Sequence, residues 1–133
     1  MGKYTPNDKW LGMTGYDEEE WPVSYHGTKE LNVESIIKNG FWVGPGHAFG
    51  YGVYSSPEPK VALEPWYATP YDFEGKTYAL IFQTRINPKL IIKIPRSSVD
   101  YWLLRLPAGT YDKMNIRPYG ICVFPCGTER NFC

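Results

Sequence analysis

The run KTYALIFQTRI, residues 76–86, is the longest stretch of the sequence that favours a β-strand. It is rich in β-branched and aromatic residues, which fit a pleated, buried surface. Its first half is apolar at odd and even positions alike, whereas a strand with one face in water carries a polar residue at every second position. We therefore expect this run to be the central strand of a sheet.

Shorter runs on both sides of this strand also favour β-structure. A turn at Asn87-Pro88 ends the central strand, and the segment from Pro107 to Asn115 is expected to be a loop. The other predicted strands cover residues 21–26, 41–43, 51–55, 90–94, 99–104 and 116–124.

Two short helices are expected between the early strands. Apolar residues at 33, 36 and 37 repeat at helical spacing, with Thr28 as a candidate N-terminal cap and Gly40 as a candidate left-handed C-terminal cap. This predicts a helix from about Glu30 to Lys38. A second helix is predicted over residues 57–64, where proline is tolerated at the start and Pro65 ends the pattern.

These elements predict an α+β fold with a mostly antiparallel sheet and about two flanking helices. A length of 133 residues fits one domain that buries about two thirds of its unfolded surface. Residues 1–20 are polar, have no sustained periodicity and end in an acidic run, so we expect them to form an N-terminal arm. The folded domain is expected to span residues 21–133.

The charge balance disfavours a polyanion such as DNA as a partner. Fourteen basic residues are matched by fourteen acidic ones, so the formal net charge is zero. No apolar run approaches the length of a membrane span, and the N-terminus lacks the features of a secretory signal. We expect a cytoplasmic or nuclear protein that does not contact a membrane.

The three cysteines lie within the last twelve residues, at positions 122, 126 and 133. An odd number of cysteines without a Cys-x-x-Cys pair argues against a disulfide scaffold and against a zinc site. Reduced thiols are the simplest interpretation, and no metal ion is expected.

Two glycine-containing segments are candidates for a ligand site. Tyr25-His26-Gly27-Thr28 ends a predicted strand with a histidine followed by a residue that has no Cβ, so ring nitrogens and backbone are offered together. The second segment is Gly50-Tyr51-Gly52-Val53-Tyr54-Ser55-Ser56. The loop between them, residues 44–50, contains His47, which we interpret as a solvated loop histidine.

In this order, and with the helix that ends at Asn39-Gly40-Phe41 between them, the two segments resemble the first half of the catalytic domain of poly(ADP-ribose) polymerases and related ADP-ribosyltransferases. The likeness covers roughly residues 23–68. In that family the two motifs lie on neighbouring strands that bind the nicotinamide half of NAD+. The resemblance implies an ADP-ribosyltransferase-like split sheet, and it implies NAD+ as a substrate. The loop 44–50 is shorter than the segment that covers the NAD+ site in the family, which implies a more open cleft.

The resemblance also implies roles for individual residues. His26 would bind a hydroxyl of the adenosine ribose, and Thr28 would contact ribose. Gly27 would bind the nicotinamide carboxamide through its backbone, while Tyr54 would stack on the nicotinamide ring. Tyr67 is the nearest match to the tyrosine that stacks on the opposite face of that ring, and packing in the core is the alternative for it.

The family has a third catalytic residue, a glutamate on a later strand. Asp100 is its expected counterpart, one methylene shorter, and a shift of one residue would put Tyr101 there instead. The implied catalytic set is therefore His26, Tyr54 and Asp100. Because the family's glutamate polarises the acceptor hydroxyl of a growing chain, its replacement favours single transfer of ADP-ribose, or hydrolysis of NAD+, over polymer synthesis.

Two other functions stay open at this point. The chain could be a catalytically degenerate module of the same fold that binds ADP-ribose-like ligands or a protein partner. A small RNA phosphotransferase of a related fold would need several arginines around the pocket, and no arginine cluster lies near the motifs. The acceptor, protein or nucleic acid, is not specified by the sequence, and we expect a monomer or one part of a larger protein.

Overall fold

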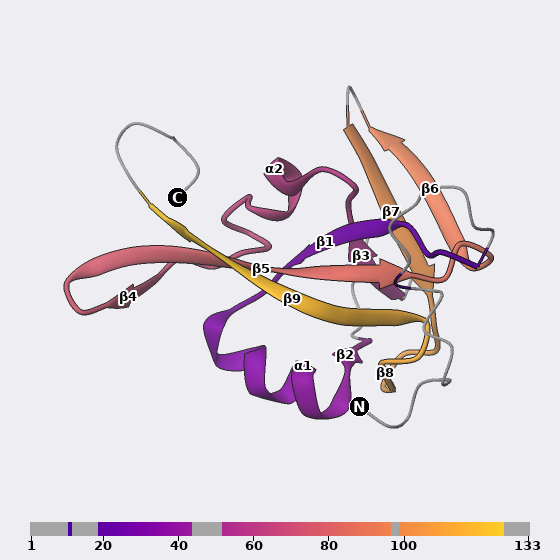
Figure 1. Ribbon diagram of the computed structural model, residues 1–133, viewed down its shortest axis with the longest axis horizontal. Helices are drawn as coiled ribbons and strands as arrows, with labels where there is room; N and C mark the ends of the chain where they lie inside the picture. The colour runs from indigo at the N-terminus through magenta and orange to yellow at the C-terminus, as the bar shows by residue number, and fades with distance from the viewer. Residues whose placement is uncertain (1–10, 12–18, 44–51, 97–98, 127–133) are drawn as a thin grey trace.

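A computed structural model describes residue 11 and residues 19–43, 52–96 and 99–126. The predicted loop 44–50 with His47, and most of the predicted arm 1–20, lie outside the described residues. All strand pairs of the described part are antiparallel, and short helices flank them (Figure 1). The α+β class with antiparallel sheets is confirmed.

The first sheet is built on β5 (Lys76–Ile86), which has strand partners along both edges (Figure 1). β9 (Ile116–Pro125) pairs along one edge, from Tyr78 to Ile86. On the other edge, β1 (Val23–Gly27) pairs with the second half of β5 and β4 (Tyr71–Phe73) pairs with its start. The prediction of a central strand is confirmed.

The second sheet has the order β3-β7-β6, with β3 at Gly52–Ser55, β7 at Val99–Arg105 and β6 at Ile91–Arg96. A separate pair joins β2 (Phe41–Trp42) to β8 (Tyr111–Asp112). The first and second sheets meet at one isolated bridge, where the Tyr25 N–H donates to the Ser56 carbonyl at 2.7 Å and the Ser56 N–H donates back at 3.0 Å.

Two apolar clusters lie on opposite faces of β5. Phe82 and Ile86 belong to the larger cluster, whereas Ala79 and Ile81 belong to the smaller one. Because successive side chains of a strand point to opposite faces, a strand buried on both faces must be apolar at odd and even positions. The larger cluster comprises Ile36, Phe41, Val43, Val53, Phe82, Ile86, Trp102, Leu104 and Ile116.

The first helix covers the predicted range and one residue more, whereas the second is shorter than predicted. The first begins as a 3-10 turn, η2 (Glu30–Asn32), and continues as α1 (Val33–Asn39). Thr28 is not its cap, because Lys29 occupies the N-terminal position and the Thr28 hydroxyl donates to the Lys29 carbonyl at 3.3 Å. Gly40 has the expected positive φ, 93°. The second helix, α2, covers only Pro59–Ala62.

The cysteine prediction needs one correction. Cys126 is disulfide-bonded, and its partner lies outside the described residues, so the expectation of three reduced thiols is wrong. Cys122 is a free thiol, and burial raises its pKa. In the described part of the chain, no helix is long and apolar enough to cross a membrane.

The hairpin between β4 and β5 was not predicted. Phe73 pairs with Lys76, so the loop is the two residues Glu74 and Gly75, and both have positive φ, 50° and 79°. These angles are those of a type I′ turn, whose twist matches that of the strands it joins. A Cβ on Gly75 would meet no atom within 4 Å, so only the backbone conformation requires glycine there.

Gly75→Ala should therefore lower the free energy of unfolding by about 1 kcal/mol, the penalty for a side chain in the left-handed region. Gly75→Asn should cost less, because asparagine tolerates this conformation. Chemical denaturation of the three proteins measures both values. Equal stability of the alanine variant and the unsubstituted protein would contradict the assigned turn.

Candidate functional site

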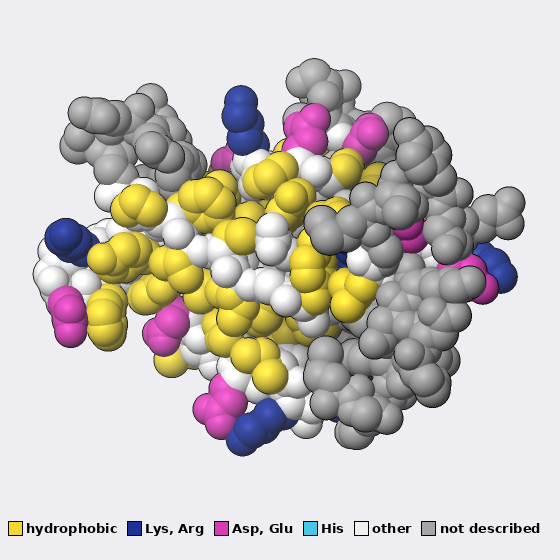
Figure 2. Space-filling view, viewed as in Figure 1, with side chains coloured by type: hydrophobic (Ala, Val, Ile, Leu, Met, Phe, Trp, Pro, Cys, Tyr) yellow, Lys and Arg dark blue, Asp and Glu magenta, His cyan; other side chains and the backbone are white. Residues whose placement is uncertain are grey.

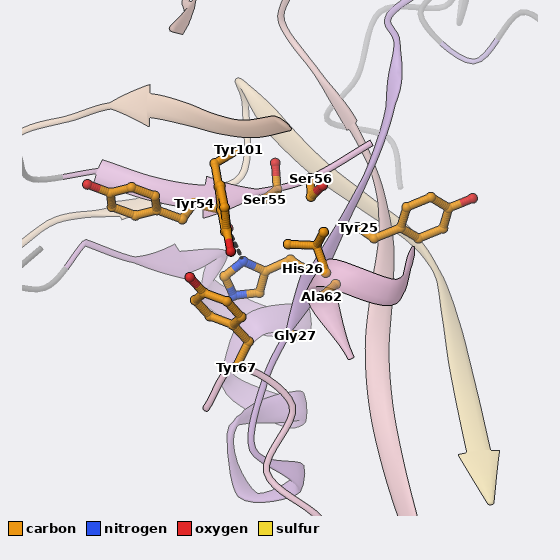
Figure 3. Close-up of a pocket in the computed structure, with 10 residues that line it drawn as sticks. Tyr25, His26, Gly27, Tyr54, Ser55, Ser56, Ala62, Tyr67 and Tyr101 are labelled. Atoms are coloured by element: carbon orange, nitrogen blue, oxygen red, sulfur yellow. Dashed lines mark hydrogen bonds between the residues drawn. The ribbon is translucent and has the colours of Figure 1, made fainter. Parts of the chain in front are cut away.

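His26 lies on β1 next to the bridge between the two sheets, and its ring is fixed from two sides (Figure 3). The carbonyl oxygen of Tyr54 on β3 is 2.7 Å from His26 Nδ1. Because a carbonyl can only accept, Nδ1 carries the hydrogen, and Nε2 is the acceptor of the neutral ring. Phe41 packs against the ring edge-to-face, with centroids 4.6 Å apart.

A small hollow of about 20 Å³ lies beside this histidine. Its lining residues come from β1, β3, α2 with the segment that follows it, and β7. They are Tyr25, His26, Gly27, Tyr54, Ser55, Ser56, Val61, Ala62, Tyr67 and Tyr101. The structure therefore brings His26 and Gly27 of the first motif together with Tyr54 of the second, and Tyr67 lines the same hollow.

Among the tyrosines that line this hollow, Tyr67 and Tyr101 direct their rings toward His26 (Figure 3). The ring of Tyr54 points away from His26 in the same view, although Tyr54 lines the hollow and its carbonyl binds the imidazole. The structure thus gives Tyr54 a positioning contact through its backbone. The two rings closest to a ligand beside His26 belong to residues 67 and 101.

The hollow as it stands has room for about one water molecule. The ring centroids of Tyr67 and Tyr101 are 6.2 Å apart, and the rings are tilted by 54°. A planar ligand between two rings needs contact distances of about 3.5 Å on each side, roughly 7 Å in all. A ring-shaped ligand would therefore enter only after Tyr67 and Tyr101 rotate and separate by about 1 Å.

A larger hollow, of about 380 Å³, lies beyond His26 on the side of α1. Thr28 lines it, as do Asn32 and Ser35, whose side chains offer hydrogen-bonding groups. Trp42 and Tyr111 form part of its wall, are about half exposed, and have ring centroids 4.8 Å apart. Since His26 lines both hollows, its ring lies at the boundary between them.

Gly27 is required by packing. A Cβ at this position would collide with the carbonyl oxygen of Ala62 and would lie 2.8 Å from Tyr67 Cβ and 2.9 Å from the Ala68 nitrogen. The sequence suggested that the missing side chain leaves room for a ligand, whereas in the structure the segment with Tyr67 occupies that space. Gly27 therefore allows Tyr67 to approach His26.

Asp100 is not part of either hollow. Its side chain is exposed, and its backbone carbonyl accepts a hydrogen bond from the Ser56 hydroxyl at 2.8 Å. Tyr101, the alternative one residue later, lines the first hollow because successive side chains of β7 point to opposite faces. The described residues that line this hollow include no carboxylate.

Ser55 was not singled out from the sequence. Its side chain is buried, it lines the first hollow, and its hydroxyl has no hydrogen-bond partner among the described residues. A buried polar group without a partner costs about 1–3 kcal/mol, which a water or a ligand that reaches it would recover. The hydroxyl is thus an unfilled hydrogen-bonding position beside His26.

No group of His, Cys, Asp and Glu side chains that could hold a metal ion occurs among the described residues. Comparison with models of known protein families gave no match for this chain, and comparison with curated proteins gave none either.

Ser55→Ala should leave the free energy of unfolding unchanged or raise it by up to about 2 kcal/mol, because it removes an unpaired buried hydroxyl. Ser24 is the matched control. It is equally buried, but its hydroxyl bonds to Thr84 Oγ1 at 2.6 Å, so Ser24→Ala should lower stability by about 1–2 kcal/mol. Thermal and denaturant unfolding measure the change in stability of each variant. An equal loss of stability in the two variants would show that the Ser55 hydroxyl has a hydrogen-bond partner.

Proposed function

We propose that this protein is an NAD+-dependent ADP-ribosyltransferase that makes a single transfer, or hydrolyses NAD+, by cleaving the nicotinamide–ribose bond. The observation that carries the proposal is the hydrogen bond between His26 Nδ1 and the Tyr54 carbonyl. It joins the two motifs on which the sequence resemblance rests. The meeting of two antiparallel sheets at the Tyr25–Ser56 bridge also supports the split sheet that the resemblance implies.

NAD+ would occupy both hollows, with His26 between its two halves. The nicotinamide would lie in the first hollow, held through its carboxamide by the Gly27 backbone and flanked by the rings of Tyr67 and Tyr101. The adenosine ribose would lie in the second, where Thr28 is available. His26 Nε2, an acceptor in the tautomer set by the Tyr54 carbonyl, suits a ribose hydroxyl, which can donate to it.

The proposed reaction needs little acid–base chemistry. The bond to positively charged nicotinamide breaks with its electron pair going to the ring nitrogen, so the leaving group departs neutral. The ribose becomes cationic as the bond breaks, and an acceptor oxygen or water attacks it and loses a proton. Rigid orientation of the nicotinamide and suitably placed dipoles supply most of the rate enhancement in such a reaction.

The absence of a carboxylate among the described residues of the first hollow favours single transfer or hydrolysis. The described lining residues therefore contain no counterpart of the glutamate that, in the resembling family, polarises the acceptor hydroxyl of a growing chain. The described residues of both hollows also include no lysine or arginine, so nothing in them supports an RNA phosphotransferase.

A second function has support from the same hollow. A volume of about 20 Å³ excludes nicotinamide until two tyrosines move, and the hollow lacks a carboxylate among its described residues. A catalytically degenerate module that binds ADP-ribose through the larger hollow, with Thr28 and Asn32, would have these properties. Such a module would bind the ligand but would not release nicotinamide.

The test is to incubate the protein with NAD+ and to measure free nicotinamide, with and without protein or nucleic-acid acceptors. Loss of a hydrogen bond or of a flanking ring corresponds to about a tenfold to hundredfold lower kcat/KM, which we expect for His26→Ala and Tyr67→Ala. Tyr101→Ala should have a larger effect than Asp100→Ala. Tyr71→Ala is the control, because Tyr71 pairs with Tyr78 on the β4–β5 hairpin and lines neither hollow.

The outcomes separate the two functions. Release that needs His26 and Tyr67 but not Tyr71 supports the transferase. Absence of release, together with a rise in Tm on addition of NAD+ or ADP-ribose, supports the binding module. If neither release nor stabilisation occurs, both proposals are wrong.

A further inference from the structure

β9 has an edge without a strand partner in the described part of the chain. It is 10 residues long and pairs with β5 alone among the described strands. The outer edge of such a strand presents alternating N–H and C=O groups that can pair with another strand. This edge is independent of the two hollows at His26, since no residue of β9 lines either one.

The features that normally protect an edge occur at the two ends of β9, where Pro118 and Pro125 lie, and not between them. The register shift opposite Gln83 and Thr84 places a β-bulge there, next to Pro118. From Tyr119 to Phe124 the strand contains no proline and no charged residue. By contrast, β6, which pairs only with β7 among the described strands, carries the exposed Lys93, and a lysine on an edge strand discourages strand addition.

Apolar side chains stand exposed beside this edge. Tyr119, Ile121 and Val123 alternate along β9 and are 39%, 43% and 50% exposed. Ile37 of α1, 57% exposed, forms the opposite wall of a groove of about 390 Å³ that Ile121 also lines. Figure 2 shows a broad apolar surface in this region of the molecule. Monomeric soluble proteins rarely leave large continuous apolar patches uncovered.

Electrostatics around the groove do not oppose the approach of a second identical surface. Glu34 and Lys38 of α1 form an ion pair of 2.8 Å. Lys113, which lines the groove, donates to the Lys38 carbonyl at 3.1 Å. The whole chain has no net charge, so two copies do not repel each other through their overall charge.

We propose that β9 pairs antiparallel with β9 of a second copy of this chain, about a two-fold axis near Cys122. This register puts Ile121 of each copy opposite Val123 of the other. The exposed apolar residues therefore cover one another on one face of the new sheet. In such an antiparallel pair, the unpaired N–H and C=O groups of each β9 edge bond to the other copy. The same surface is used by both copies, as a two-fold interface requires. Cys122 and Phe124 stay packed against the smaller core cluster of their own copy.

Sedimentation velocity over a range of protein concentrations tests the proposal, with a reversible monomer–dimer equilibrium as the expected result. Val123→Lys and Ile121→Lys should each weaken dimerisation at least about tenfold, because each places two charges at the two-fold interface and a lysine on the edge. Leu90→Lys is the matched control. Leu90 is similarly exposed, 42%, but precedes β6 in the second sheet, so its substitution should leave the dimer intact.

Two further readouts keep the result decisive. Circular dichroism must show that the lysine variants are folded, and hydrogen exchange of the unsubstituted protein should show β9 amides that become more protected as concentration rises. Nicotinamide release or NAD+ binding should be the same for Val123→Lys and the unsubstituted protein, so failure of this proposal is distinguishable from failure of the proposed function. A protein that stays monomeric, or a dimer that both lysine variants retain, would overturn the proposal. A strand from a different protein would then be the occupant to look for.

Discussion

The hydrogen bond from His26 to the Tyr54 carbonyl is the contact on which the site depends. It lies beside the Tyr25–Ser56 bridge, where the sheet of β5 meets the sheet of β7. Three hydrogen bonds therefore hold β1 against β3 within a few residues of each other. This arrangement sets the tautomer of the imidazole, and it places Tyr101 of β7, the middle strand of the second sheet, next to Tyr67.

Close approach of backbone segments makes this arrangement possible. Gly27 lets the segment from Ala62 to Ala68 pack directly on β1, and Gly52 does the same for β3 and β7, where a Cβ would collide with the Leu104 carbonyl. The result is a small hollow with an unpaired hydroxyl, Ser55, and two tyrosines whose rings nearly touch. Tight packing that leaves a buried polar group unpaired lowers stability, and it is typical of ligand-binding sites.

The parts of the fold that follow from strong periodicity could be predicted from the sequence. The double-sided apolar run of β5 identified the central strand, and the spacing of Val33 and Ile36 identified α1. The helix cap and the turns were harder to predict from the sequence. Thr28 has the right chemistry for a cap, but the helix starts one residue later with a 3-10 turn. The sequence does contain a pattern that indicates the Glu74-Gly75 turn, because a glycine-containing pair between two β-prone runs is typical of a hairpin.

The candidate site was predicted as a pair of motifs but not in its detail. His26, Gly27, Tyr54 and Tyr67 do meet around one hollow. The choice between Asp100 and Tyr101 depends on a single step of strand register, which exchanges the two faces, and local composition does not fix that step. The direction of the Tyr54 ring and the contact that requires Gly27 arise from segments distant in sequence, so neither could be read from the motifs alone.

The most direct test of this account is the nitrogen NMR spectrum of the His26 imidazole, assigned by comparison with His26→Gln. We predict that in alkaline buffer the neutral ring carries its hydrogen on Nδ1, and that NAD+ shifts the Nε2 resonance while Nδ1 keeps its bond to the Tyr54 carbonyl. A hydrogen on Nε2, or an Nε2 resonance that NAD+ leaves unmoved at concentrations that stabilise the fold, would contradict the account.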